Sequence, residues 1–249
     1  AYVKDSNLRT STNLTQTAVN DTTIKAISAA LVASKHVAIS GGISINDIAS
    51  SARAYIDNST KIDKNIDVSL LHSIAATDES DIEVIAGAMS ASKSASLGAS
   101  VSTNKISNTV EAYINNAVMN QSAADTSLTA KNVSTIRSIA GSIGASSKAG
   151  AGVAVAVNRI NNNTSAFVSG AATDIDNKNL LVSTLSDANI ETISVALGAS
   201  GKVGVGGSVS TNFIDNNTLA YIAGGAKVVA ENNVGVLAES DDRITVSAG

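Results

Sequence analysis

The chain has 249 residues and a net charge of −4, with 44% hydrophobic and 15% charged residues. This balance excludes a disordered chain, and without a Lys/Arg cluster it gives no reason to expect a nucleic acid as partner. Proline, cysteine and tryptophan are absent and aromatic residues make up 2%, whereas a globular enzyme normally uses all of them. The longest apolar run, residues 149–157, is far below the roughly 18 residues of a membrane helix, so we predict no membrane-spanning segment.

One line of sequence recurs four times at nearly constant spacing. Each copy has an asparagine, an isoleucine two residues later, and an aromatic followed by a branched aliphatic nine residues later. The intervals between the asparagines are 58, 54 and 54 residues. Such self-similarity indicates a repeat architecture. The residues predicted to be structural markers of the repeat are Asn46, Asn104, Asn158, Asn212, Tyr55, Tyr113, Phe167 and Tyr221.

The repeat makes the chain one array rather than a set of separate domains. Ala1-Tyr2-Val3 matches Ala54-Tyr55-Ile56, so the chain starts inside one repeat, and it also stops inside one. We therefore interpret it as a slice of a longer protein. The predicted units are a partial repeat at 1–26 and repeats at about 27–84, 85–138, 139–192 and 193–249.

Each unit opens with a segment of alternating character, such as residues 193–200, and a two-residue break that ends in lysine. A second alternating segment follows, such as residues 203–214. Two such arms predict either a tight antiparallel hairpin or two sides of a solenoid coil joined at a corner. We interpret the four lysines as devices for solubility rather than as a binding stripe: Lys35, Lys93, Lys148 and Lys202.

The second arm alternates with a strict period of two, which predicts a β-strand rather than a helix. In the last repeat Val203, Val205 and Val209 fall on one side, and Gly204 and Gly206 on the other. A face of Gly, Ala and Ser allows another backbone layer to approach closely. We expect both faces of these strands to be covered.

A polar corner is expected after each marker asparagine, as at residues 161–164 and 215–218, because Asn favours turns. Stacked at successive levels, these Asn side chains would form hydrogen-bonded ladders. The aromatic strand comes next, then a second polar break at 176–179 or 231–233, then a shorter strand. For the aromatics we favour a buried stack with one ring per repeat over an exposed row that binds sugars.

No set of residues predicts catalysis. His36 and His72 lie at different phases of the repeat and are expected to face solvent. The acidic segments 78–81 and 239–242 are interpreted as solvated loops, because the glycine-aspartate repeat of calcium-binding β-rolls is absent. The glycines at 204–207 lack the following helix of a dinucleotide loop. We predict no enzyme activity, no catalytic residue, no cofactor and no metal.

With the unit defined, the chain resembles repeats of giant bacterial surface exoproteins. The lines that carry this resemblance are IAGSIGASSKAGAGVAVAVNRINNNTSAFV and VALGASGKVGVGGSVSTNFIDNNTLAYI. They are similar to repeats of filamentous adhesins of the autotransporter and two-partner-secretion kinds, including leukotoxin-like filamentous adhesins. The resemblance implies an all-β, elongated, right-handed parallel β-solenoid that is secreted unfolded and displayed outside the cell. The absence of cysteine is compatible with that location.

Two versions of the fold stay open at this point. In one, about 54 residues spread over two or three coils of a solenoid, which advances by roughly 10 to 15 Å per repeat. In the other, each repeat projects an antiparallel hairpin, residues 193–214 in the last unit, from a solenoid spine. The longer first interval is expected to reflect a loop insertion near Asp78-Glu79-Ser80-Asp81.

The function expected first is structural and adhesive: a stalk or an extracellular filament on a bacterial surface. Its partners would be molecules of the host or of neighbouring cells, or like chains in a filament. One alternative is a segment of a secreted leukotoxin-like cytotoxin. A β-helical polysaccharide enzyme is less favoured, because such enzymes need clustered carboxylates and aromatic or Arg platforms.

Overall fold

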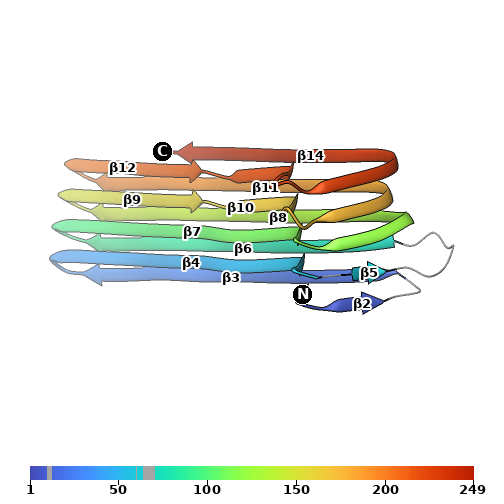
Figure 1. Cartoon of the computed structure of the whole chain (residues 1–249). Coiled ribbons are helices and arrows are strands. Elements are labelled where there is room, and N and C mark those ends of the chain that lie inside the picture. Colours follow the sequence, from blue (N-terminus) through green and yellow to red (C-terminus); the bar gives the residue numbers. More distant parts are fainter. Residues whose placement is uncertain (10–12, 60, 64–70) are drawn as a thin grey trace.

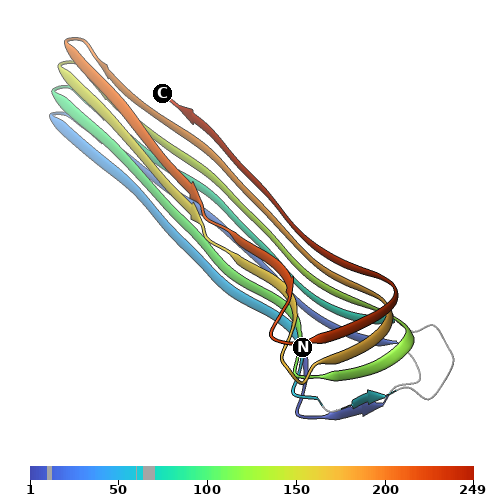
Figure 2. The same ribbon diagram turned by 45° about the horizontal axis from the view of Figure 1, so that its top comes forward.

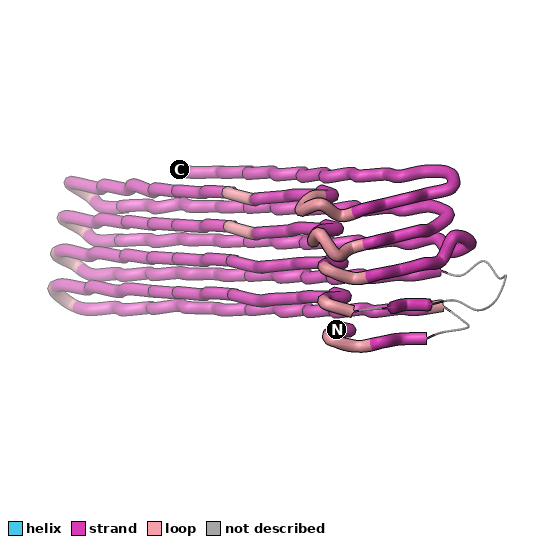
Figure 3. The backbone as a smooth tube through the Cα atoms, viewed as in Figure 1, coloured by secondary structure: helices cyan, strands magenta, loops and turns pink. Residues whose placement is uncertain are grey.

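The computed structural model describes residues 1–9, 13–59, 61–63 and 71–249. Over these residues the chain is all β, with two sheets and no helix. Long strands run between a narrow end, where the chain reverses sharply, and a broad end, where it curves (Figures 1 and 2). Figure 3 shows that strand fills most of the path between the turns.

The strands divide between two sheets, called A and B. Sheet A contains β1 (Tyr2–Lys4), β4 (Val37–Asp57), β7 (Ala95–Asn115), β9 (Ala149–Ile160), β10 (Asn163–Ser169), β12 (Val203–Ile214) and β13 (Asn217–Ile222). Sheet B contains β2 (Asn7–Arg9), β3 (Leu14–Ser34), β5 (Lys61–Asp63), β6 (Leu71–Ser92), β8 (Val118–Ser146), β11 (Asp174–Ser200) and β14 (Lys227–Ala248).

All the described strand pairings are parallel, and they join equivalent residues of successive repeats. Asn104 in β7 lies opposite Asn158 in β9, which lies opposite Asn212 in β12. Partners are therefore one repeat apart, so each repeat forms one coil of a parallel β-solenoid. The solenoid fold is confirmed, but the expectation of two or three coils per repeat is wrong. Each coil advances by one strand spacing, about 4.8 Å.

The two arms of each unit do not form a hairpin. Residues 193–200 belong to β11 in sheet B, which pairs with β8, while residues 203–214 form β12 in sheet A, which pairs with β9. The reversal between them is an arc that joins the two sheets at the narrow end (Figure 1). The prediction of an antiparallel hairpin is therefore wrong. The short break between the two arms forms the corner of a solenoid coil.

The polar corners predicted after the marker asparagines are also wrong. Residues 107–109 lie inside β7, and the interruption at 161–162 separates β9 from β10 without reversing the chain (Figure 1). The second polar break, at 176–179, lies inside β11 and carries only a shift of register. The chain turns instead at the broad end, where Asn58 and Asn116 adopt positive φ.

The interior tapers from the broad end to the narrow end. Large aliphatic side chains fill the broad end, among them Ile56, Ile74, Ile114, Met119 and Leu128. A second cluster occupies the middle of the coil: Ile48, Ile82, Ile106, Ile136, Ile160 and Ile190. Near the narrow end the buried side chains are small: serines such as Ser100 and Ser142 and an alanine cluster of Ala140, Ala154, Ala156 and Ala196. Because buried volume falls along the strands, the sheets converge.

At the narrow end the two sheets meet almost backbone to backbone. A Cβ added to Gly144 in β8 would lie 2.6 Å from the carbonyl carbon of Ala151 in β9, so no side chain fits there. The small-residue face therefore points inward, and the branched residues point outward. Val153 is 44% exposed and Ile85 47% exposed, although both lie in internal coils. The expectation that both faces are covered is wrong.

The longer first interval does not come from the acidic segment 78–81. Leu8 pairs with Ile62, 54 residues away, whereas Leu14 pairs with His72, 58 residues away. The register thus places the additional residues between β5 and β6, and that connection, residues 64–70, lies outside the described residues. Residues 78–81 lie within β6, so the predictions of a loop insertion and of a solvated loop at this position are wrong.

Candidate interaction surface

The four marker asparagines form one hydrogen-bonded column inside the coil. The Nδ2 atoms of Asn46, Asn104 and Asn158 each donate to the Oδ1 atom of the asparagine in the next coil, at 2.8, 2.7 and 2.8 Å. Asn158 also donates to Thr192 at 2.8 Å, across to sheet B. The column therefore binds successive coils to one another and sheet A to sheet B.

A second polar column lies between the two aliphatic clusters and centres on Asp78. This carboxylate is fully buried and accepts hydrogen bonds from Asn20 (2.8 Å), Ser80 (2.8 Å), Asn108 (2.6 Å) and Ser50. One coil further on, Asn132 takes the position of Asp78, and Asn162 of sheet A donates its amide to Asn132 and Ser134. Both columns are internal, so they organise the coil and offer nothing to a ligand.

The aromatic residues form a continuous stack on the outer face of sheet A at the broad end. Tyr55, Tyr113, Phe167 and Tyr221 stack with centroid distances of 4.7 to 5.0 Å, and Tyr2 extends the stack at 5.3 Å. The rings are partly exposed, while the aliphatic that follows each one in sequence points inward, as at Ile56. The prediction of a stack is correct, and the prediction that it is buried is wrong.

The two histidines differ in environment. His36 lies exposed at the first arc of the narrow end, as expected. His72 is 0% exposed on the inner face of β6, so its predicted solvent exposure is wrong. Within the described residues no group of three or more His, Cys, Asp or Glu side chains is arranged to hold a metal ion. The second acidic segment, residues 239–242, is exposed as expected, but it lies within β14, so the prediction of a loop there is wrong.

A column of alternating charge crosses the outer face of sheet B. Lys25 pairs with Glu83 at 2.9 Å, and Arg137 contacts both Glu83 and Glu191. The hydrogen bond between Lys25 and Glu83, aided by their Coulomb attraction, lowers the pKa of Glu83 and raises the pKa of Lys25. On sheet A the corresponding outer column begins with Asp47 and Lys105, which pair at 3.7 Å.

Beyond these charges, toward the arcs, both outer faces of the narrow end are apolar. We call the outer face between Val37 and Ile45, with its equivalents in later coils, the A face. The outer face between Ile27 and Ala33, with its equivalents, is the B face. The exposed aliphatics on the A face include Val37, Ile39, Ile43, Ile45, Leu97, Val153, Val203, Val205 and Val209. Those on the B face include Ile27, Leu31, Ile85, Met89, Ile139, Ile193, Val195 and Leu197.

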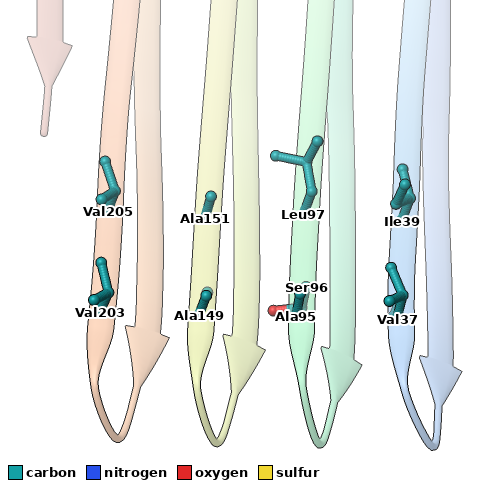
Figure 4. Close-up of a pocket in the computed structure, with 11 residues that line it drawn as sticks. Val37, Ile39, Ala95, Ser96, Leu97, Ala149, Ala151, Val203 and Val205 are labelled. Atoms are coloured by element: carbon teal, nitrogen blue, oxygen red, sulfur yellow. The ribbon is translucent and has the colours of Figure 1, made fainter.

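The apolar faces are not flat. On the A face, Ala149 and Ala151 leave a hollow of about 310 Å³ that is bounded on one side by Leu97 and on the other by Val203 and Val205 (Figure 4). On the B face, a furrow of about 570 Å³ has a floor of small residues, Ala29, Gly87 and Gly141. Contiguous exposed apolar surface of this kind is typical of interaction sites.

The four lysines of the arcs form an exposed row along the edge between the A face and the B face. Among the described residues no helix is long and apolar enough to cross a membrane.

No protein-family model, curated protein or solved structure matches this chain. The sites described above therefore rest on their own geometry. The predicted marker residues sort into two of them, the asparagine column and the aromatic stack. The apolar faces are the surface that sequence reasoning missed, because their branched residues were expected to be covered.

Proposed function

We propose that this chain is a structural and adhesive repeat segment of a secreted bacterial surface protein, part of an extracellular stalk or filament. The observation that carries the proposal is the register of the solenoid, in which like stacks on like. Asn104 pairs with Asn158, and Tyr113 lies between Tyr55 and Phe167. A coil that fits its own copy can be added many times without a new interface.

The coil is built for mechanical continuity rather than for one local site. Many of its polar contacts join equivalent residues of adjacent coils, for example Asn179 donating to Asp125 at 2.7 Å and Asn217 donating to Asn163 at 3.0 Å. Backbone pairing adds to these contacts, and between β11 and β8 it runs from Asp174 to Ser200 with one shift of register. Such an array folds by adding one coil at a time, which suits a chain that crosses membranes unfolded.

The geometry also sets the form of the stalk. A coil adds about 4.8 Å to the length, so a stalk 100 Å long needs roughly twenty coils. The strands across it have 21 residues or more in β3, β4, β6 and β7, which corresponds to about 70 Å of width. The filament is therefore a broad ribbon, and most of its surface lies on its two faces.

The partners that fit this proposal are molecules of the host or of neighbouring cells, or like chains in the same filament. The exposed apolar faces and the partly exposed aromatic stack are the surfaces that would meet them.

The test is immunogold electron microscopy of intact cells that produce the whole protein, with antibodies raised against this chain. We expect gold particles outside the cell envelope, removed when the cells are shaved with protease. As a matched control, antibodies against a cytoplasmic protein must label only after permeabilisation. Labelling that requires permeabilisation would contradict the proposal.

A further inference from the structure

We propose that the A face and the B face of the narrow end bind each other between copies of this chain. Solenoids would then pack side by side, with sheet A of one copy on sheet B of the next. The starting observation is that aliphatic side chains of internal coils stay half exposed even after stacking on their neighbours, as Met89 and Ile139 do at 46% and 42%.

The relief of the two faces is complementary. The furrow of the B face, floored by Ala29, Gly87 and Gly141, is walled by larger residues such as Leu31 and Met89, and Val195 ends the floor in the fourth coil. The A face carries a ridge of branched residues at the level of Ile43: Ile43, Val101, Val155 and Val209. The first three ridge residues seated in the furrow are buried there, as in interdigitated sheets, and Val209 packs on Val195.

A second copy is the occupant that matches the furrow in period. The side chains of ridge and furrow repeat once per coil, at the strand spacing of about 4.8 Å. Only a partner built from coils of the same spacing keeps its side chains in step along the whole furrow. A flexible peptide or an irregular protein surface would fill one or two coils and then lose register.

The charges that border the two faces support the same arrangement. With the ridge at Ile43 seated over Ala29 and both narrow ends pointing the same way, Asp47 comes opposite Lys25, because each lies four residues further from the arc. In the next coil Lys105 comes opposite Glu83. These are two pairs of opposite sign. In the third coil Arg159 comes opposite Arg137, which is a pair of like charge. The guanidinium of Arg137 already contacts Glu83 and Glu191, and these carboxylates offset its charge.

The area of four coils is close to the lower limit for a specific interface. In this register the contact runs from Ile39 to Asp47 on one copy and from Ala33 to Lys25 on the other, about 30 Å along the strands, and four coils cover about 19 Å, so each partner contributes about 570 Å². A stable interface buries roughly 800 Å² on each partner. Each further coil adds about 140 Å², so affinity is expected to rise steeply with the number of coils.

The interface uses two different faces of each copy, so it does not close into a dimer. Such a heterologous contact continues from copy to copy. The lysine row at the arcs stays outside the contact, and its charge opposes edge-to-edge association of the narrow ends. The expected product is a lateral stack of ribbons.

Cysteine cross-linking tests this pairing directly, since the chain has no cysteine of its own. The double variant Ala29→Cys/Ile43→Cys places one thiol on each face, and the two thiols point away from each other within a copy. On oxidation we expect a series of disulfide-linked dimers, trimers and larger species. Each single variant should give at most a small amount of dimer. Efficient dimers from Ile43→Cys alone would mean that A packs on A, and would overturn the proposal.

Sedimentation velocity over a range of concentrations provides the second test. The outward substitutions Ile43→Lys and Val101→Lys, combined, are expected to weaken self-association by about tenfold or more. Ser51→Lys, on the same strand, exposed and outside the A face, is the matched control and should assemble as the parent chain does. A parent chain that stays monomeric at high concentration would overturn the proposal. Binding of monomers to phosphatidylcholine vesicles through these faces would also overturn the proposal, because it would make the two faces a lipid-binding surface.

This inference stands apart from the proposed function. Lateral packing is measured on the purified chain, so its failure would leave an extracellular location intact. Conversely, a protein found inside the cell could still assemble through the same faces.

Discussion

Asp78 shows how an individual residue can be essential to the coil without being part of a binding site. It is a fully buried carboxylate whose oxygens accept hydrogen bonds from donors of both sheets, including Asn20 and Asn108. In the neighbouring coils the same position is an asparagine, Asn20 on one side and Asn132 on the other. A short polar side chain with acceptor oxygens is therefore what this position requires.

Asp78→Ala should destabilise the solenoid, because it leaves several buried donors without an acceptor. We expect a loss of about 3 kcal/mol, measured by urea unfolding followed by circular dichroism. Asp187→Ala is the control, since Asp187 lies exposed on β11, one residue out of phase with this column. It should change stability by less than about 0.5 kcal/mol. Equal effects of the two variants would contradict this role for Asp78.

The environments of Asp78 and His72 could have been predicted only from their parity. Both share the even-numbered phase of Ile74 and Ile82, which is the inward phase of β6. Composition pointed the other way, because Asp-Glu-Ser-Asp looks like a solvated loop. Three of the donors that make a buried carboxylate tolerable come from other strands, Asn20 of β3, Ser50 of β4 and Asn108 of β7, and such partners are not visible in the local sequence.

At the scale of the strands, the glycines of the narrow end control how closely the two sheets approach. Gly144 and Gly141 lie three residues apart on β8 and face opposite ways. A Cβ at Gly144 would overlap the backbone of Ala151, whereas a Cβ at Gly141 would meet nothing within 4 Å. Alanine substitutions at these two positions therefore distinguish the effect of contact between the sheets from the effect of backbone flexibility in the unfolded chain.

Gly144→Ala should push β8 and β9 apart and cost about 1–3 kcal/mol. Gly141→Ala should be neutral or stabilise by about 0.4–1 kcal/mol, because it restricts only the unfolded chain. Thermal unfolding of the two variants beside the parent checks the difference. If both variants lose the same stability, the sheets do not meet where the structure places them.

The strands themselves were predictable, and their packing was not. A period of two in residues 203–214 correctly indicated a strand, and it correctly separated the branched face from the small one. The period does not say which of the two faces points into the coil, however, and the usual rule that hydrophobic residues point inward gives the wrong answer here. The interior here is too thin for Val205 or Val209, so these residues point outward. The arc at Lys202 was equally compatible with a hairpin, since the two differ only in which strand each arm pairs with.

For the whole molecule, the coil is the unit that can be removed. Ile139 and Ile193 are register partners in β8 and β11. Deletion of residues 139–192 therefore joins Ser138 directly to Ile193. Ile193 is the register partner of Ile139, the residue that normally follows Ser138. One coil is lost and the remaining coils stack as before.

We expect this deletion variant to keep its β circular dichroism and its cooperative unfolding. Its dimension along the solenoid axis, measured by small-angle X-ray scattering, should shrink by about one strand spacing of 4.8 Å. Deletion of residues 139–165 is the control. It joins Ser138 of sheet B to Ala166 of sheet A, so the coil cannot close and the protein should misfold. A stable product from that control would show that register is not what holds the coils together.

The array was predictable from the recurrence of four asparagines, but its rise was not. Polar breaks such as 161–164 suggested corners, and one version of the fold spread about 54 residues over two or three coils. In the structure these asparagines lie along straight arms, where Asn162 donates inward to Asn132 and Ser134. Whether a polar side chain marks a turn or a buried ladder depends on the partner across the coil.

The flat cross-section of the coil would give any long filament of this protein an unequal resistance to bending. The cross-section is about 70 Å wide, whereas sheets packed face to face are about 10 Å apart. For an elastic bar with these proportions, the ratio of the two bending stiffnesses is the square of the ratio of width to thickness. Flexing through the faces is then roughly fifty times easier than flexing edgewise. Such a filament would follow a curved surface readily when one of its faces lies against that surface, and it would resist bending within the plane of its sheets.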